Sequence, residues 1–270
     1  MQAHLRPFQT FVNNVINTIQ HDTQTIGLAV GGSWASAELD AYSDLDLVIV
    51  TREKIAPDLS QMRAYAARLG TMLSSFRGDH VGEPRLLIAL YDSPLLHVDI
   101  KFLTIDEFYH RVEDPTILWE RDGQLTSVLQ QSTARYPDFD YQWIDDRFWV
   151  WMHYAGLKIG RGEYFEALDF ISFIRSMVIG PMLQIRQGAL PRGVRRIETT
   201  LPVEDMARLR KTVATPDRNS LLDSIHEVYK LYEDLCNELA PVTLQKNSEA
   251  RVVVKKYLAA LQSPMPYLND

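Results

Sequence analysis

The sequence is poor in the residue that builds disulfide frameworks and many zinc sites. Cys236 is the only cysteine among the 270 residues, so the sequence excludes an internal disulfide and a cysteine-rich zinc site. A run of about 18 or more apolar residues is also lacking, which argues against a membrane span. The N-terminus lacks the basic-then-apolar layout of a secretory signal. We therefore expect a protein of a reducing, cytoplasmic compartment that makes no contact with a membrane.

An excess of positive charge is absent as well. The chain has 28 lysines and arginines against 35 aspartates and glutamates, a formal net charge of −7 at pH 7. Proteins that bind a nucleic-acid backbone usually present a basic face, because much of their affinity comes from neutralising the phosphate charges. The charge balance therefore favours small or cationic substrates over nucleic acid. It gives no indication of the oligomeric state.

What is present is the composition of a folded chain, with 46% apolar and 23% charged residues and enough length for two modest domains. Strand patterns occupy the first half and helical patterns the second. They predict an α+β protein, with a mixed-sheet domain and flanking helices over residues 1–125. An all-helical domain is expected over residues 140–270.

The individual elements follow from periodicity and turn residues. Alternating or β-branched runs predict strands over 25–30, 44–51, 85–91, 95–103 and 117–120, and the turn at 92–94 makes the third and fourth an antiparallel hairpin. Helical spacing predicts helices over 5–20, 33–40, 57–75 and 104–112, the last begun by a capping box. Further helices are expected over 141–158, 163–186, 203–213, 218–239 and 249–262, with a break or kink at Gly180-Pro181.

The most informative stretch is GGSWASAELDAYSDLDLVIV, residues 31–50. Gly32 lets the backbone turn sharply and approach a ligand closely, and Ser33 supplies a hydroxyl where a helix begins, a position that favours anions. Asp44 and Asp46 are two residues apart on one strand, so their carboxylates point to the same face. Carboxylates this close repel each other unless a cation lies between them, and hard oxygen ligands suit Mg²⁺.

A third carboxylate lies on a later strand. In LLHVDIKFL, residues 95–103, the apolar residues alternate with His97, Asp99 and Lys101, so Asp99 and Lys101 share the face opposite the core. An aspartate in the middle of a strand is disfavoured by propensity and needs a reason to be there. If this strand lies beside 44–51, the three carboxylates converge and can hold two metal ions that bridge a nucleotide triphosphate.

A Gly-Ser pair, a ten-residue gap, D-x-D on a strand and a lone later aspartate together resemble the signature of the DNA polymerase β-like nucleotidyltransferases. The second half, with RGEYFEALDFISFIR at 161–175, is similar to the C-terminal domain of their antibiotic branch, which includes aminoglycoside and lincosamide adenylyltransferases. The resemblance implies transfer of a nucleoside monophosphate, AMP from ATP, to a hydroxyl of a small-molecule acceptor such as an antibiotic. The acceptor would bind between the domains, and pyrophosphate would be the leaving group.

The resemblance also implies roles for single residues. Gly32 and Ser33 would hold the β- and γ-phosphates, and Asp44, Asp46 and Asp99 would ligate two Mg²⁺ ions. Asp99 would bind the catalytic metal and accept the proton of the acceptor hydroxyl. Some antibiotic-modifying members take the general base from the helical domain instead, so both sources of the base stay open.

Other residues have two interpretations each. Lys101 is a candidate to contact a phosphate or Asp99, but a plain surface lysine is the leading interpretation. Glu163 and Glu166 share a helix face near a predicted helix start, where acids favour the helix dipole. They would otherwise bind a cationic acceptor or supply the base.

Two rival functions remain open. The first is nucleotide addition to a nucleic-acid end, and the second is a non-catalytic, antitoxin-like nucleotide-binding module. Retention of all three carboxylates argues against the module. A nucleic-acid enzyme needs a basic groove, for which the candidates are Arg186, Arg192, Arg195 and Arg196.

Overall fold

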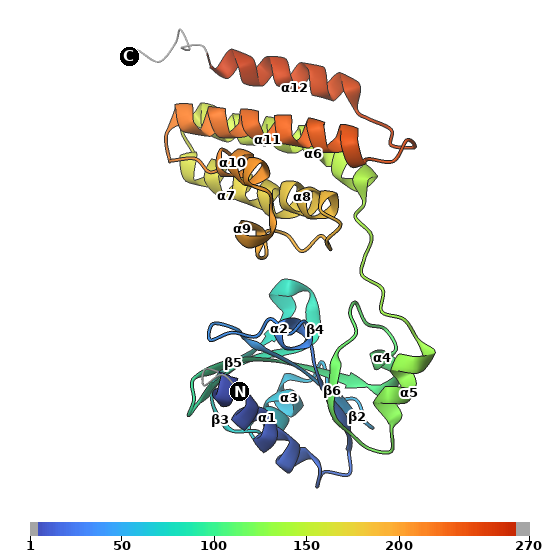
Figure 1. Cartoon of the computed structure of the whole chain (residues 1–270). Helices are drawn as coiled ribbons and strands as arrows, with labels where there is room; N and C mark the ends of the chain where they lie inside the picture. The colour runs from blue at the N-terminus through green and yellow to red at the C-terminus, as the bar shows by residue number, and fades with distance from the viewer. Residues whose placement is uncertain (1–4, 263–270) are drawn as a thin grey trace. The chain divides into compact units, whose positions relative to one another are not determined.

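The computed structural model describes residues 5–262. The chain divides into two compact units, Met1–Pro137 and Asp138–Asp270. The first unit contains a six-stranded sheet with helices around it, and the second is built from helices (Figure 1). The predicted α+β class, with a mixed sheet followed by a helical part, is confirmed.

The sheet joins strands that are far apart in the sequence. Its order is β3-β4-β5-β2-β1-β6. Strands β2 and β5 pair in parallel, and every other neighbouring pair is antiparallel. The parallel pair lies in the middle of the sheet and brings the D-x-D segment beside the segment of the later aspartate. The strands are β1 (Thr25–Val30), β2 (Leu45–Thr51), β3 (Thr71–Gly78), β4 (Glu83–Asp92), β5 (Leu96–Thr104) and β6 (Thr116–Glu120).

Helices cover the two faces of the sheet unequally. Helices α1 (Arg6–Ile19) and α3 (Leu59–Ala66) lie on one face (Figure 1), where they pack on alternate residues of β2 and β5 such as Leu47 and Ile100. The opposite face is covered by α4 (Ile105–Phe108) and α5 (Gln124–Gln131). These two helices pack around one end of the central strands, on Val50 and Leu103.

The second unit packs its helices around one core, in which the ring of Phe148 stacks on that of Tyr232 at 3.6 Å between centroids. Side chains begin three of the helices: Asp140, Asp217 and Asn247 each accept a backbone N–H of the first turn, which satisfies donors that a helix leaves unpaired. The helices are α6 (Tyr141–Arg161), α7 (Tyr164–Ile174), α8 (Gly180–Arg186), α9 (Ile197–Thr200), α10 (Val203–Arg210), α11 (Arg218–Leu239) and α12 (Ser248–Leu261).

The prediction of one helix over residues 57–75 is wrong. Helix α3 ends at Ala66, and residues 71–78 form β3 at the edge of the sheet. The strand shows little alternation because α3 and the core cover only part of this edge strand, at residues such as Met72, and leave its other apolar residues exposed. Leu73 is 55% and Phe76 is 50% exposed. The helical stripe of Met62, Tyr65 and Ala66 is buried as expected.

Several element ends also differ from the predictions. The helix expected over 33–40 is only Gly32–Ala35 (α2), and the capping box of Thr104 and Glu107 begins a helix that ends at Phe108 rather than at residue 112. The helical stretch expected over 163–186 continues through Gly180-Pro181 to Arg186, and its irregularity is a π-helical turn over Arg175–Ile179, just before that pair. Neither α5 nor α9 was predicted, and α5 lies in the first unit, beyond residue 125.

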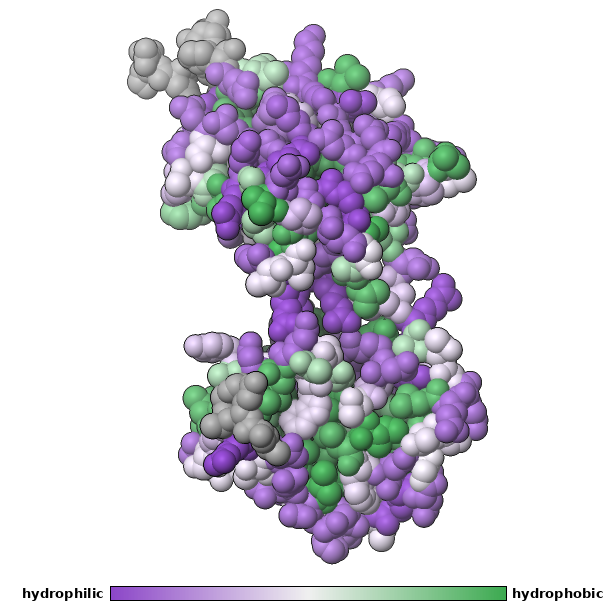
Figure 2. Space-filling model, in the orientation of Figure 1, coloured by the Kyte–Doolittle hydropathy of each residue, from purple (hydrophilic) through white to green (hydrophobic). Residues whose placement is uncertain are grey.

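The helical stretch Tyr164–Arg186 is long and apolar enough to cross a membrane, with a mean hydropathy of 1.3. Half of its most apolar window is buried inside the protein. The core helix of a soluble protein passes the same test, so this stretch is weak evidence for a membrane span. Hydrophilic residues predominate on the face of this unit that Figure 2 shows.

Candidate functional site

The register of the parallel pair brings two predicted site residues together. Asp46 of β2 lies directly opposite Asp99 of β5. Their strand neighbours Leu45 and Val98 are fully buried on the α1 and α3 face, so the two carboxylates point to the other side of the sheet. Adjacent strands are about 4.8 Å apart, which puts both carboxylates within reach of one small ligand.

This end of the sheet is not covered by the two helices that pack on the same face. Along β2 and β5, the paired positions run from Asp46 and Asp99 to Val50 and Leu103. Only the second pair belongs to the core beneath α4 and α5. Asp46 and Asp99 are accordingly only partly buried, and a ligand can reach them.

Asp44 joins the pair from the residue before β2. Burial raises the pKa of the Asp99 carboxyl above its ordinary value, and the negative charge of Asp44 adds to the rise. His97 lowers it, because its Nε2 lies 3.0 Å from Asp99 Oδ1, and the charge of His80 lowers it further. The site is therefore a row of three carboxylates with two histidines beside it. Neither histidine was predicted from the sequence to have a role here.

The glycine turn lies against the same carboxylates. The Gly31 N–H donates to the Asp46 carbonyl at 2.8 Å. Gly32 has a φ of +56°, and a Cβ there would lie 1.8 Å from Asp46 Oδ2. A residue with a Cβ here would be strained and would push the Asp46 carboxylate out of its position. Within residues 5–262, the buried hydroxyl of Ser33 has no hydrogen-bond partner, so no other group of the protein takes its donor.

Lys101 shares the face of Asp99 but pairs elsewhere. Its Nζ lies 3.1 Å from Glu83 Oε2. Glu83 also binds Arg85, and hydrogen bonding by Arg85 and then Lys101 lowers the pKa of Glu83 to about 2. The phosphate contact considered for Lys101 stays a prediction.

Glu113 is a residue of this site that the sequence analysis missed. Strand β6 pairs with β1 so that Thr116 lies opposite Val30, and the residues before Thr116 therefore lie beside the glycine turn. The Gly32 N–H donates to Glu113 Oε1 at 3.4 Å. No motif marks Glu113, and only knowledge of the β1–β6 pairing would have identified it.

The carboxylate and hydroxyl oxygens of this site are the type of ligand that Mg²⁺ prefers. Across the described part of the chain, no three histidine, cysteine, aspartate or glutamate side chains form a ready metal site. Mg²⁺ in nucleotide enzymes is commonly held by one or two carboxylates together with substrate phosphates, and does not need a cage built wholly of protein. A row of carboxylates beside a glycine turn and a partnerless hydroxyl matches that mode of binding.

The raised pKa of Asp99 gives a testable effect on stability. The folded protein disfavours the ionised carboxyl, so this residue reduces stability as pH rises above its ordinary pKa of 3.8 and through the raised folded value. We expect Asp99→Asn to melt at a higher temperature than the parent at pH 7 in EDTA, with the gain vanishing as pH falls toward 3.8. Thermal melts of the two proteins across this pH range measure the difference in melting temperature.

Asp92→Asn, which removes the same charge at an exposed position, is the matched control and should show no such gain. A loss of stability in Asp99→Asn at pH 7 would mean that the carboxylate has a structural partner.

In the second unit, the two glutamates considered for a cationic acceptor already have partners. Lys158 Nζ lies 2.7 Å from Glu163 and 2.9 Å from Glu166. The hydrogen bonds of Glu163 and Glu166 raise the pKa of Lys158, and the Tyr154 hydroxyl donates to Glu166. Lys158 therefore neutralises one of the two carboxylate charges, and Arg161 lies 3.7 Å from Glu163, which favours the structural interpretation.

The arginines considered for a nucleic-acid groove are also partly engaged. Arg186 forms ion pairs with Asp205 and with Glu238. Arg195 and Arg196 lie exposed in the loop between α8 and α9. Of the four arginines, Arg186 has its charge offset by two acids.

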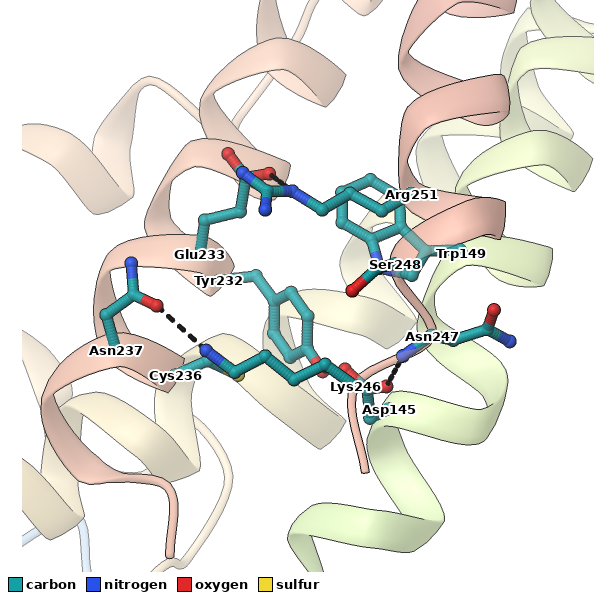
Figure 3. A pocket seen from close by; sticks show the side chains of 10 residues that line it. All are labelled: Asp145, Trp149, Tyr232, Glu233, Cys236, Asn237, Lys246, Asn247, Ser248 and Arg251. Atoms are coloured by element: carbon teal, nitrogen blue, oxygen red, sulfur yellow. Dashed lines mark hydrogen bonds and ion pairs between the residues drawn. The ribbon is translucent and has the colours of Figure 1, made fainter. Parts of the chain in front are cut away.

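Figure 3 shows a pocket of the helical unit, lined by residues of α6, α11 and the start of α12. Its cavity volume is about 40 Å³, which holds a few water molecules, whereas sites for small molecules occupy about 300–1,000 Å³. Its polar groups bind one another, as in the pairs Arg251–Glu233 and Lys246–Asn237. We interpret it as a polar cluster that fastens α12 to the bundle.

The centre of this cluster is Asp145, which is 4% exposed. It accepts the Tyr232 hydroxyl at 2.9 Å and the Asn247 backbone N–H at 2.8 Å. Asp145→Ala leaves the buried Tyr232 hydroxyl without its acceptor, whereas the N–H of the exposed Asn247 can bind water instead. We therefore expect a loss of about 1–3 kcal/mol in the free energy of unfolding, measured by urea denaturation. Asp146→Ala, at an exposed neighbour, should change it by less than about 0.5 kcal/mol. Equal effects of the two substitutions would contradict this account.

Comparison with solved structures finds sixteen similar chains, among them the following three. An aminoglycoside 6-adenyltransferase from Bacillus subtilis is 12% identical, with 98% of this chain and 100% of that chain covered and a TM-score of 0.41. A nucleotidyltransferase-like protein from Exiguobacterium sibiricum 255-15 is 13% identical, covering 94% and 89%, with a TM-score of 0.36. A spectinomycin adenyltransferase from Enterococcus faecialis, crystallised with ATP and spectinomycin, is 12% identical, covering 94% and 99%, with a TM-score of 0.29.

At such identities and TM-scores these likenesses carry no argument about activity. No family model matches the chain, and no curated protein is similar to it.

Proposed function

We propose that this protein is a Mg²⁺-dependent nucleotidyltransferase that moves a nucleoside monophosphate, AMP from ATP, to a hydroxyl of a small molecule and releases pyrophosphate. The observation that carries the proposal is the register of β2 and β5, which sets Asp46 opposite Asp99 at the uncovered end of the sheet. Beside them lies a glycine turn in which a Cβ on Gly32 would displace the Asp46 carboxylate. The resemblance of the Gly-Ser and D-x-D motifs to nucleotidyltransferases supports the same reaction.

In this proposal each group has a chemical task. Asp44, Asp46 and Asp99 would hold Mg²⁺, and the ion would supply positive charge to offset the charge that develops on the transferred α-phosphate. The turn at Gly32 and the Ser33 hydroxyl bind the terminal phosphates, which become the leaving pyrophosphate.

Asp99 is the candidate to accept the proton of the attacking hydroxyl. Burial raises its pKa, which makes it a better proton acceptor once ionised. Within the described helices, Glu163 and Glu166 are bound to Lys158, so they are weaker candidates for this base.

The acceptor is proposed as a small molecule, and an antibiotic is the candidate that the resemblance suggests. The net charge of −7 and the pairing of Arg186 with two acids disfavour a nucleic-acid end. The direct experiment is a screen of hydroxyl-bearing compounds, aminoglycosides and lincosamides among them, with each nucleotide triphosphate and Mg²⁺, recording released pyrophosphate. Pyrophosphate release that depends on one acceptor class supports the proposal, and release that depends on an RNA or DNA end supports the rival function.

A further inference from the structure

The side chain of Glu113 lies where the proposed function places the terminal phosphates of the nucleotide. Its Oε1 accepts the N–H of Gly32 at 3.4 Å, and a Cβ on Gly31 would lie 3.3 Å from the same oxygen. The backbone donor that the proposed function gives to a phosphate oxygen is thus taken by a carboxylate oxygen in this structure. The two anions cannot occupy one donor together, because like charges at hydrogen-bonding distance repel strongly.

The backbone that carries Glu113 is held on both sides. After Glu113, β6 pairs with β1 from Thr116 onward. Before it, the Arg111 side chain is only 7% exposed and donates to the Ser132 hydroxyl at 2.6 Å and the Ser132 carbonyl at 2.7 Å. Arg111 also forms an ion pair with Asp114 at 2.6 Å. Because the loop is fixed at both ends, an incoming phosphate would displace the Glu113 side chain alone.

We propose, on the basis of the proposed function, that Glu113 is a further residue controlling nucleotide binding. It occupies the terminal-phosphate position of the nucleotide-free protein, and a triphosphate must displace it. The carboxylate keeps the Gly32 donor paired while no nucleotide is bound, and its charge selects against weak occupation by other anions. Displacing Glu113 weakens the binding of ligands that place a phosphate at Gly32. A nucleoside monophosphate lacks the terminal phosphates, so its affinity does not depend on Glu113.

The test is calorimetric binding of ATP and of AMP, each with Mg²⁺ and without acceptor, to the full chain. Glu113→Gln keeps an oxygen that can accept the Gly32 N–H but removes the charge. We expect it to bind ATP about tenfold more tightly than the parent, the size of effect that removal of a like charge beside a bound anion can give. The affinity for AMP should stay the same.

The control is Asp122→Asn, which removes one negative charge in the turn after the other end of β6 and should leave both affinities unchanged. A merely structural Glu113 would change the two affinities equally or not at all, and either result overturns the proposal. Weaker ATP binding in Glu113→Gln, together with a higher Mg²⁺ requirement, also overturns it and would make Glu113 a metal ligand. If neither the parent nor any variant binds ATP, the proposed function fails and the role of Glu113 fails with it.

Discussion

Asp46→Asn should abolish turnover, reducing kcat by about a thousandfold or more while the protein stays folded. Asp46 is the residue that the sheet register sets opposite Asp99, and it also touches the glycine turn. Losing its charge weakens the binding of the cation that stabilises the transition state, and loss of a single preorganised electrostatic contact typically costs about 10²–10³ in rate. Asp44→Asn should act in the same way. Steady-state kinetics at saturating Mg²⁺ with the acceptor found in the screen measures the effect.

The matched control is Asp40→Asn, an exposed position in the segment just before β2. Its Oδ1 accepts the Tyr42 N–H at 2.8 Å, and asparagine retains that oxygen. Asp40→Asn should keep full activity although it removes the same charge. Turnover near the parent rate in Asp46→Asn would show that the row of carboxylates does not take part in the reaction.

The second large effect is expected from one methyl group in the glycine turn. In Gly32→Ala the new Cβ would lie 1.8 Å from Asp46 Oδ2 and 2.9 Å from its Cγ, so the carboxylate must rotate away from its place beside Asp99. The φ of +56° adds about 1–2 kcal/mol of strain for any residue with a Cβ. We expect activity to fall about a hundredfold in a protein that still folds.

Gly31→Ala provides a control one residue away. Its φ is −103°, and its new Cβ would meet only the end of the Glu113 side chain at 3.3 Å and Asp46 Cβ at 3.8 Å. Both contacts can adjust, so the variant should keep activity within about tenfold of the parent. Steady-state kinetics compares the activity of the two variants, and circular dichroism checks that both are folded. Equal activity would show that the position of the Asp46 carboxylate is not critical.

The sequence predicted best where local chemistry decides the structure. The strand over 25–30 is found with these bounds as β1, and the capping box of Thr104 and Glu107 is present with both of its hydrogen bonds. The face of Asp99 followed from the alternation of β5, in which Val98 and Ile100 are fully buried. In these cases the pattern within one element is enough, because burial on one side fixes the period.

Pairing between distant segments could not be derived in the same way. Nothing local shows that β2 pairs with β5 in parallel, so the position of Asp46 opposite Asp99 depended on assuming that the two strands are neighbours. The same limit hid Glu113, which reaches Gly32 only because β6 lies beside β1. Strand β3 was missed because its exposed edge position removes the alternation that marks a strand.

The most direct test of nucleotidyl transfer uses ATP with a radioactive label on either the α- or the γ-phosphate, together with Mg²⁺ and an acceptor from the screen. The product that carries each label is then identified. In the proposed function, the row of carboxylates acts at the transferred phosphate and the glycine turn binds the leaving ones. We therefore predict that the α-label appears on the acceptor and the γ-label in pyrophosphate, and that both transfers stop in EDTA and in Asp46→Asn. A γ-label on the acceptor would make the protein a phosphotransferase and would contradict this account.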